Sequence, residues 1–283
     1  MRYVDVGLVA LVIALVAATR IGSASWRRMV HRIVVDMRTA ARATPLLSNR
    51  YFAEDIARLP LPVKRYFAFA LSQGQPLIVA ARATSRGAFR LRLHGAWHSF
   101  TAIQDFSALP HAFIWDATIK LAPMLMVDVA DRYIKGEGAI DARAVGVIPV
   151  VDAQGTPELA TGELLRYLAE LAMMPTALLP RNGVQWSPVD ATSARVTLTD
   201  HGTTVSARFF FGTRGEIVRV EADRFRDVDG MPVLTPWIGD FREYRSVQGM
   251  MVPMYSQAAW LVDGEVRPYF RGHALGIAFE LAS

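Results

Sequence analysis

The spacing of hydrophobic residues changes near residue 77, and the two spacings predict different secondary structure. Before this point apolar residues fall at helical intervals: an uncharged apolar run covers residues 6–18, and an arginine-rich amphipathic stretch covers residues 27–50. A further helical stretch at 60–72 begins with Pro62, because proline fits the first turn of a helix. The first 72 residues are therefore expected to be mainly helical.

From residue 77 onward apolar and polar residues alternate, which indicates strands with one buried face. In one clear case, Trp115 and Ile119 alternate with Asp116 and Lys120. The same alternation covers residues 88–106, 113–121, 126–150 and 194–281. Short turns, such as that at Asp229-Gly230, connect the predicted strands, so neighbouring strands should pair antiparallel.

A single helix, residues 161–173, interrupts the predicted strands. Thr161 is expected to cap its N-terminus, and leucines at helical spacing form its apolar stripe. Glu163, Arg166 and Glu170 fall three and four residues apart, a spacing typical of ion pairs on an exposed helix face. We therefore expect these three side chains at the surface.

Together these patterns predict an α+β, β-rich fold. It consists of a large curved antiparallel sheet, shaped as a half-barrel and covered by a few helices, with an additional N-terminal hydrophobic helix. No linker rich in Gly, Ser or Pro divides the strand region. The predicted organisation is an N-terminal membrane anchor or signal segment at 1–26, a basic amphipathic helix at 27–50 and one antiparallel β-rich domain at 51–283.

The apolar run at 6–18 admits three interpretations. Its helix spans about 20 Å, short of the roughly 30 Å hydrocarbon core, but Tyr3 and the residues up to Trp26 extend it. We favour a single-pass N-terminal anchor in the cell membrane; a cleaved signal peptide and a buried soluble helix remain alternatives. Arginines after the run place the following domain in the cytoplasm, whereas a signal peptide places it outside, so the side of the membrane stays open.

The positive charge of the chain is concentrated at its N-terminus. Residues 1–50 contain eight arginines and two aspartates, whereas the remaining residues carry 23 basic and 24 acidic side chains. A domain without excess positive charge lacks the basic surface that nucleic-acid binding requires. Arginines beside an apolar run suit anionic lipid headgroups, so membrane lipid is a predicted partner and nucleic acid is not.

No sequence motif predicts a catalytic, metal or cofactor site. The chain has no cysteine, no G-x-S-x-G nucleophile elbow and no phosphate-binding loop. His94 and His98 are four residues apart, but in a strand this spacing separates them by about 13 Å, too far for one metal ion to bridge. We therefore predict no catalytic residues, no metal and no cofactor.

Aromatic residues occur in most of the predicted strands. In one interpretation they fill an ordinary core. In a second, they line the hollow of the curved sheet and hold an acyl chain or a similar apolar ligand. The ligand-binding residues predicted by the second interpretation are Trp97, Phe113, Trp115, Asp116, Trp237 and Trp260.

Several segments occur in an order that resembles a known protein family. They include LPLPVKRYF, the pair WHSFTAIQDF and FIWDATIKLAP, GELLRYLAELAMMPTALLP, TLTDHGTTVSARFFF and TPWIGDF. Over roughly residues 55–280 the chain is similar to an uncharacterised bacterial family, a domain of unknown function whose members carry an N-terminal apolar segment. This resemblance implies no activity and no catalytic residues. In its fold the chain also resembles the bacterial lipoprotein carriers, which implies a curved sheet around an apolar cavity closed by helices.

Three functional hypotheses follow. The favoured one is a membrane-anchored, non-enzymatic module that binds a lipid or another hydrophobic small molecule. The second is a hydrolase or isomerase with an unfamiliar site centred on Asp116 and His98. The third is a structural, protein-binding membrane module, which predicts a filled interior and an exposed apolar patch. The sequence predicts no particular oligomeric state.

Overall fold

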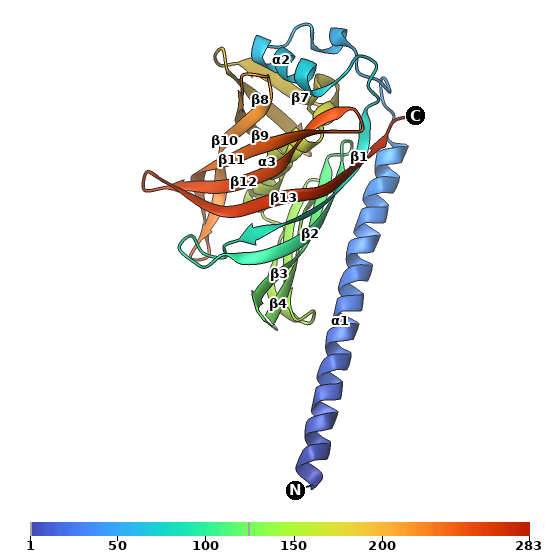
Figure 1. The fold of residues 1–283 in the computed structure, drawn as a ribbon, viewed down its shortest axis with the longest axis vertical. Helices are drawn as coiled ribbons and strands as arrows, with labels where there is room; N and C mark the ends of the chain where they lie inside the picture. Colours follow the sequence, from blue (N-terminus) through green and yellow to red (C-terminus); the bar gives the residue numbers. More distant parts are fainter. Residues whose placement is uncertain (1, 124) are drawn as a thin grey trace.

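The computed structural model describes the backbone of residues 2–123 and 125–283, and the side chains of residue 17, residues 19–123 and residues 125–283. One antiparallel sheet of thirteen strands dominates this part of the chain (Figure 1). The first six strands are β1 (Ile78–Phe89), β2 (His98–Ser107), β3 (Ala112–Ala122), β4 (Leu125–Ile134), β5 (Glu137–Ala144) and β6 (Ile148–Gln154). The other seven are β7 (Val184–Pro188), β8 (Ser193–Asp200), β9 (Thr203–Phe211), β10 (Ile217–Val228), β11 (Met231–Val247), β12 (Met250–Val262) and β13 (Glu265–Leu281). The predicted large antiparallel sheet with few helices is confirmed.

The strand order follows the chain except at one place. The order of the strands in the sheet is β6-β5-β4-β3-β2-β1-β13-β12-β11-β10-β9-β8-β7. The first strand of the chain, β1, therefore pairs with the last, β13, in the middle of the sheet. The sheet curves, and its hollow side holds the helix α3 (Pro157–Glu170) (Figure 1). We call this side the concave face and the opposite side the outer face.

The core lies on the concave face because every second side chain along the strands points to this face, and most of these side chains are apolar. On β3, Phe113, Trp115 and Ile119 are buried there, while Ile114 packs on the outer face. Two 3-10 turns follow α3: η2 (Leu171–Met173), which is buried except for the half-buried Met173, and η3 (Pro175–Leu178), which is fully buried. A third turn, η4 (Pro180–Asn182), leads into β7. These elements fill the deepest part of the hollow.

Helix α3 differs from the prediction in its start and in its exposure. Thr156, not Thr161, caps it, and the Thr156 hydroxyl accepts a hydrogen bond from the Leu159 amide (3.2 Å). Glu163 is buried and Arg166 nearly so, which contradicts the expected surface position. The reason is tertiary: α3 packs against β4, β5, β9 and β10 at once, so its charged side also faces protein.

Helix α1 (Arg2–Ala43) packs on the outer face against β1, β2 and β3. The indole of Trp26 donates a hydrogen bond to Asp116 (2.9 Å), and Arg38 forms an ion pair with the buried Asp105 (2.8 Å). The helix is continuous across the boundary expected at 26/27 and ends at Ala43, seven residues before the predicted end of the amphipathic stretch. Its N-terminal end lies away from the sheet (Figure 1).

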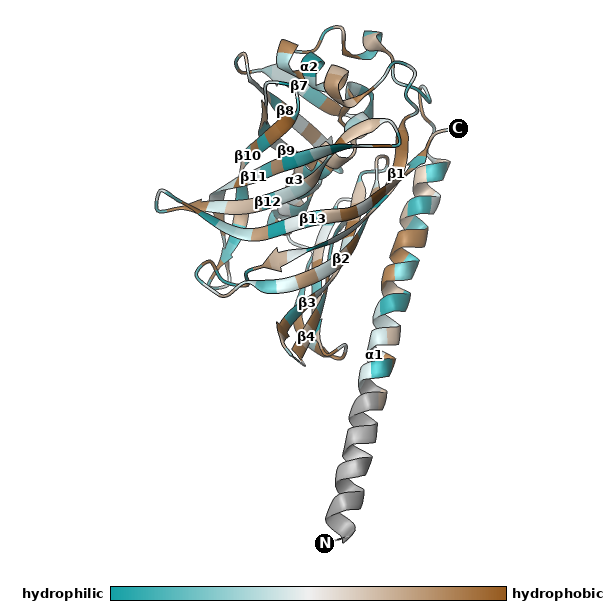
Figure 2. Cartoon of the chain, viewed as in Figure 1, coloured by the Kyte–Doolittle hydropathy of each residue, from teal (hydrophilic) through white to brown (hydrophobic). Residues whose placement is uncertain are grey.

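The predicted transmembrane helix receives no support from the described side chains. Within that part of the chain, no helix has a stretch both long and apolar enough to cross a bilayer. Except for Ala17, the side chains of the apolar run at 6–18 lie outside the described part of the chain, and Figure 2 colours those residues grey.

One predicted strand is shorter than the alternation suggests. Residues 90–97, which were expected to belong to a strand at 88–106, form the loop between β1 and β2. A turn closes this loop, with the Gly95 amide donating to the Arg92 carbonyl (2.8 Å). The predicted helix at 60–72 is present as α2 (Leu61–Ala70), which follows the 3-10 turn η1 (Ala53–Ile56) and covers the end of the sheet opposite the β3–β4 turn.

Buried polar groups join two distant parts of the sheet at the end where α2 lies. Asp200, at the end of β8, accepts a hydrogen bond from the hydroxyl of Tyr133 on β4 (2.7 Å) and contacts His111 Nδ1 (3.2 Å). His111 Nε2 lies 3.0 Å from the Asn182 carbonyl oxygen. Because both ring nitrogens have oxygen partners, His111 acts here as a tie between the β2–β3 turn and the far side of the sheet.

Candidate functional site

A continuous group of aromatic rings covers the concave face where β1 and β12 end and β13 begins. We call it the aromatic wall, and its members are Phe89, Phe100, Trp115, Trp237, Trp260, Tyr269 and Phe270. Phe100 stacks on Phe270 (5.3 Å between ring centroids) and meets Trp115 edge-on (5.5 Å). Phe89, Tyr269 and Phe270 are half-buried, so the wall reaches the surface at this open end of the hollow.

Tyr269 connects the aromatic wall to charged groups deeper in the hollow. Its ring stacks on Trp260 (5.6 Å), and its hydroxyl accepts a hydrogen bond from the Trp237 indole (2.9 Å). Arg224, from β10, donates to the same hydroxyl (3.4 Å). A molecule lying on the rings would therefore meet a polar group at the inner edge of the wall.

Five charged residues meet beneath the wall, between α3 and the sheet. We call them the ionic cluster: Asp131, Glu163, Arg166, Glu170 and Arg224. Arg224 donates to Glu163 (2.7 Å) and to the Gly162 carbonyl (3.0 Å). Arg166 forms ion pairs with Asp131 and with Glu170, and its guanidinium lies over the rings of Phe113 and Trp115.

The charges of the cluster balance only when one carboxyl group is protonated, because three carboxylates face two guanidinium groups. Burial, followed by the negative charge of Asp131, raises the pKa of Glu163 to about 8. Glu163 Oε2 and Asp131 Oδ1 are both buried without another hydrogen-bond partner. A proton carried by Glu163 and donated to Asp131 satisfies both atoms, so the cluster holds a proton at neutral pH.

Burial raises the pKa of Glu163 but lowers the pKa of a buried arginine, because in both cases it disfavours the charged form. It disfavours the charged form of Arg166, but the carboxylates of Glu170, Asp131 and Glu163 outweigh this and raise the pKa of the guanidinium. Arg166 therefore stays charged in the interior. The cluster as a whole attaches α3 to strands from both halves of the sheet.

Four of the six predicted ligand-binding residues face the hollow. Trp115, Trp237 and Trp260 belong to the aromatic wall, and Phe113 lies beside them under Arg166. Asp116 points to the outer face, where it contacts α1, and burial raises the pKa of this carboxyl although the Trp26 indole opposes the shift. Trp97 precedes β2 and lies under Arg90 and Arg271 (4.4 and 4.3 Å from the ring centroid). Arg271 alternates out of phase with Phe270, so Trp97 does not share the hollow.

The second hypothesis requires Asp116 and His98 to converge, and they do not. Ile103 pairs with Asp116 and Phe100 with Ile119, so positions 98, 100 and 102 of β2 face the hollow whereas Asp116 faces outward. The two side chains lie on opposite faces of the sheet. No three His, Asp or Glu side chains within the described residues are arranged to hold a metal ion.

Sequence reasoning found only part of the ionic cluster. The spacing of Glu163, Arg166 and Glu170 on α3 predicted ion pairs at the surface, whereas Asp131 on β4 and Arg224 on β10 stand in no recognisable motif. The available signal was Arg224 within the alternation of β10, where Val220 and Ala222 point to the same face. An arginine in phase with core residues indicates a buried charge and therefore a partner.

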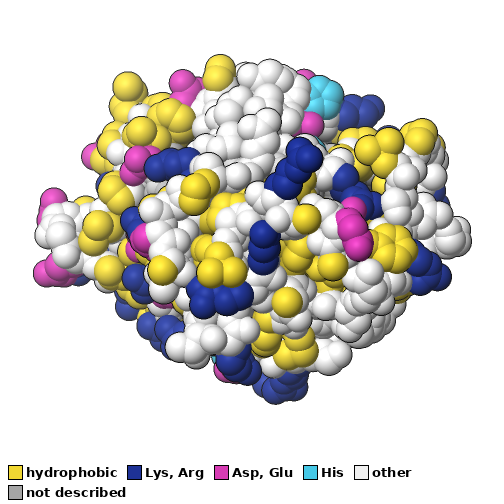
Figure 3. All heavy atoms as spheres, turned by 90° about the horizontal axis from the view of Figure 1, so that it is seen from above, with side chains coloured by type: hydrophobic (Ala, Val, Ile, Leu, Met, Phe, Trp, Pro, Cys, Tyr) yellow, Lys and Arg dark blue, Asp and Glu magenta, His cyan; other side chains and the backbone are white. Residues whose placement is uncertain are grey.

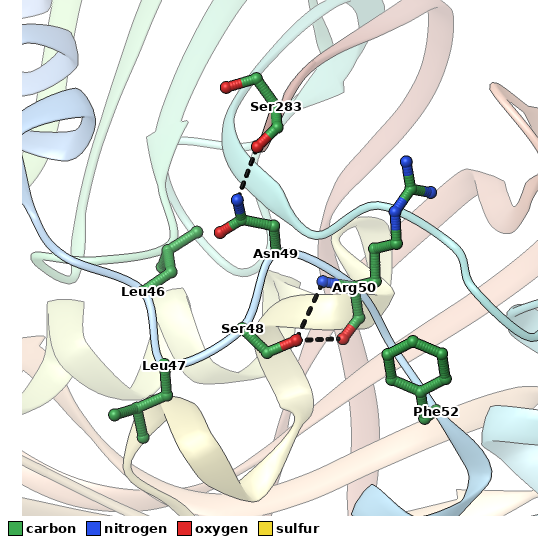
Figure 4. A pocket seen from close by; sticks show the side chains of 7 residues that line it. All are labelled: Leu46, Leu47, Ser48, Asn49, Arg50, Phe52 and Ser283. Atoms are coloured by element: carbon green, nitrogen blue, oxygen red, sulfur yellow. Dashed lines mark hydrogen bonds between the residues drawn. The ribbon is translucent and has the colours of Figure 1, made fainter.

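A shallow depression elsewhere on the surface belongs to the chain ends (Figure 4). It is lined by residues 46–50, Phe52 and Ser283. Asn49 donates to the backbone oxygen of Ser283 (2.5 Å), and the Ser48 hydroxyl donates to the Arg50 carbonyl (3.0 Å). These local bonds occupy its polar groups and fix the connection after α1 against the C-terminus.

Comparison with known proteins supports the predicted family. The model of a family described as "Family of unknown function (DUF6544)" matches residues 50–272. This agrees with the resemblance inferred over roughly 55–280. No curated protein matches the chain.

The solved structures that match the chain are distant from it. A DUF1329 family protein from Desulfovibrio piger is 6% identical, with 73% of this chain and 88% of that chain covered at a TM-score of 0.40. A LolA superfamily protein from Nitrosomonas europaea is 8% identical, with coverage of 77% and 92% and a TM-score of 0.33. Scores this low do not establish a shared fold, so the architecture rests on the strand pairing of the chain itself.

Proposed function

Because the chain belongs to the family of unknown function DUF6544, its role has to be inferred from its own geometry, and we propose that it is a membrane-anchored, non-enzymatic module that binds a hydrophobic ligand on its concave face. The observation that carries this proposal is the aromatic wall. Its half-buried rings extend the core to the open end of the hollow, where an apolar molecule gains contact area on entering.

The inner edge of the wall supports an amphiphilic ligand over a purely hydrocarbon one. The Tyr269 hydroxyl and the Arg224 guanidinium lie next to each other there, and both can donate hydrogen bonds. An acyl chain on Phe270 and Trp260 would place a carboxylate or phosphate end toward these donors. Long-chain fatty acids are the simplest molecules with this chemistry.

Replacing Phe270 with alanine is expected to weaken binding of dansylated undecanoic acid about tenfold, since a lost aromatic contact contributes roughly 1–1.5 kcal/mol. Binding is measured by energy transfer from the wall tryptophans in the full-length protein in detergent. Phe210→Ala is the matched control, because Phe210 is also half-buried but lies on the outer face under Arg208. Equal affinities for the two variants, or no energy transfer in the wild type, would contradict the proposed site.

The filled centre of the hollow favours a second candidate, a structural membrane module without a ligand. Leu171, Ala172, Met174 and Leu178 have no exposed surface, so α3 and the turns after it fill the hollow around them. A ligand would therefore lie on the wall at the rim, or α3 would have to move. Absence of co-purifying lipid, together with no stabilisation by fatty acids, would favour the structural role.

The membrane anchor is proposed from the apolar run at 6–18. The full-length protein is expected to remain with membranes after an alkaline wash, and Ile13→Asp is expected to release it, because a charge near a helix centre costs about 2.5–3.5 kcal/mol of insertion. Val35→Asp, an exposed position on α1, is the control. A mature N-terminus at or after residue 24 would instead identify the run as a signal peptide.

A further inference from the structure

The end of the sheet that lies beside the middle of α1, near Gly22, carries an exposed apolar surface. We call it the tip patch; it comprises Leu125, Met126, Ile148, Val150 and Val151, which are 41–58% exposed. Val127 on β4 pairs with Ala144 on β5, and Ala144 pairs with Ile148 on β6, so the starts of β4 and β6 lie at the same end of the sheet on either side of β5. This end appears hydrophobic at the tips of β3 and β4 (Figure 2).

The tip patch is fixed against α1 by a close backbone approach. A side chain at Gly22 would come within 2.3 Å of the Gly146 carbonyl oxygen, in the turn between β5 and β6. A side chain at Gly146 would in turn meet Ser23 Oγ at 2.8 Å. Two glycines therefore allow the β5–β6 turn to lie directly on the helix, and the neighbouring Ile21 is 67% exposed.

The apolar run ends four residues before this contact. Four helical residues advance about 6 Å, so a bilayer that contained residues 6–18 would have its surface at the level of the tip patch. This inference rests on the anchor proposed above. The opposite end of the molecule, where α2 lies, mixes basic, acidic and apolar side chains (Figure 3).

The charges near the contact suit an anionic surface. Arg20, Arg27 and Arg28 are exposed on α1 at this level, and Lys120 is exposed at the end of β3. Arg143, on β5, lies over the Trp26 ring 5.7 Å from its centroid. Basic side chains close to a bilayer surface are attracted to anionic lipid headgroups.

We propose that the tip patch docks into the headgroup region of an anionic lipid bilayer, so that α1 and the β3–β6 tip together fix the orientation of the domain on the membrane. Burial of exposed aliphatic side chains supplies the apolar contribution, and the flanking basic residues supply attraction to anionic headgroups.

The chain has no cysteine, so a single fluorescent label can report the environment of one position. The full-length variant Val150→Cys, labelled with bimane, is reconstituted in vesicles of phosphatidylcholine and phosphatidylglycerol that contain nitroxide lipid. We expect strong quenching at position 150 and at the second position, Ile148→Cys, and weaker quenching without phosphatidylglycerol. Leu61→Cys, on α2, is the control and should remain unquenched, since it is equally accessible but lies at the far end.

The outcomes separate the two proposals. Flotation of the vesicles in a density gradient tests whether the protein is attached to them. If the protein floats with the vesicles but labels at positions 148 and 150 are quenched no more than the label at 61, docking is rejected and the anchor stands. If the protein does not float, the anchor is rejected and docking with it. If the label at 150 instead responds to protein concentration in lipid-free detergent and not to nitroxide lipid, the patch binds a second copy of the chain and the bilayer is rejected.

Discussion

Replacing Arg166 with methionine should lower the free energy of unfolding by about 3–5 kcal/mol, the range for removing one partner of a buried ion pair. Arg166 is the common partner of Asp131 and Glu170 and lies 4.0 Å from Glu163. Methionine preserves most of the volume against Phe113 and Trp115, so the loss arises mainly from carboxylates left without a counter-charge. Urea unfolding followed by tryptophan fluorescence measures it.

The control is Arg208→Met, because Arg208 has the same kinds of contact in an exposed position. Its guanidinium lies over the Phe210 ring at 4.6 Å and forms an ion pair with Asp190. An exposed pair of this type contributes about 0–1 kcal/mol. If the two substitutions cost the same, the ionic cluster does not stabilise the position of α3, and the account of this helix as attached by charge is wrong.

The strand pattern was predictable from sequence because it is local. Alternation has a period of two residues whatever the rest of the fold does, so the face of each β3 residue could be assigned directly. The same rule separates Trp115 from Asp116, which are adjacent in sequence and therefore point to opposite faces. Grouping both in one predicted site ignored this consequence of the alternation.

The position of α3 was not predictable by the same means. The spacing of Glu163, Arg166 and Glu170 has the same form on a surface helix as on a helix enclosed by a sheet. The difference depends on Asp131 and Arg224, which lie more than thirty residues away in one direction and more than fifty in the other. A one-dimensional pattern holds no information on which strands enclose a helix, so the ionic cluster emerged only with the fold.

The pH dependence of stability is the second large effect expected from this cluster. Because the pKa of Glu163 is raised from 4.5 to about 8, the folded protein keeps a proton that the unfolded chain releases across this range. The contribution of Glu163 to stability is therefore complete below the lower value and is lost as the pH rises toward the upper one. The loss is at most about 1.4 kcal/mol per pH unit and ends above the upper value.

The variant Glu163→Gln isolates this contribution. Its amide oxygen can still accept from Arg224 and its amide nitrogen can donate to Asp131, so it reproduces the protonated carboxyl group at every pH. We expect the variant to match the wild type near pH 4.5 and to become progressively more stable than it toward pH 8. Glu221→Gln, on the outer face, controls for the loss of one negative charge. Parallel pH profiles for wild type and Glu163→Gln would mean that Glu163 ionises alike in the folded and the unfolded protein. That result would contradict the conclusion that Glu163 and Asp131 share a proton.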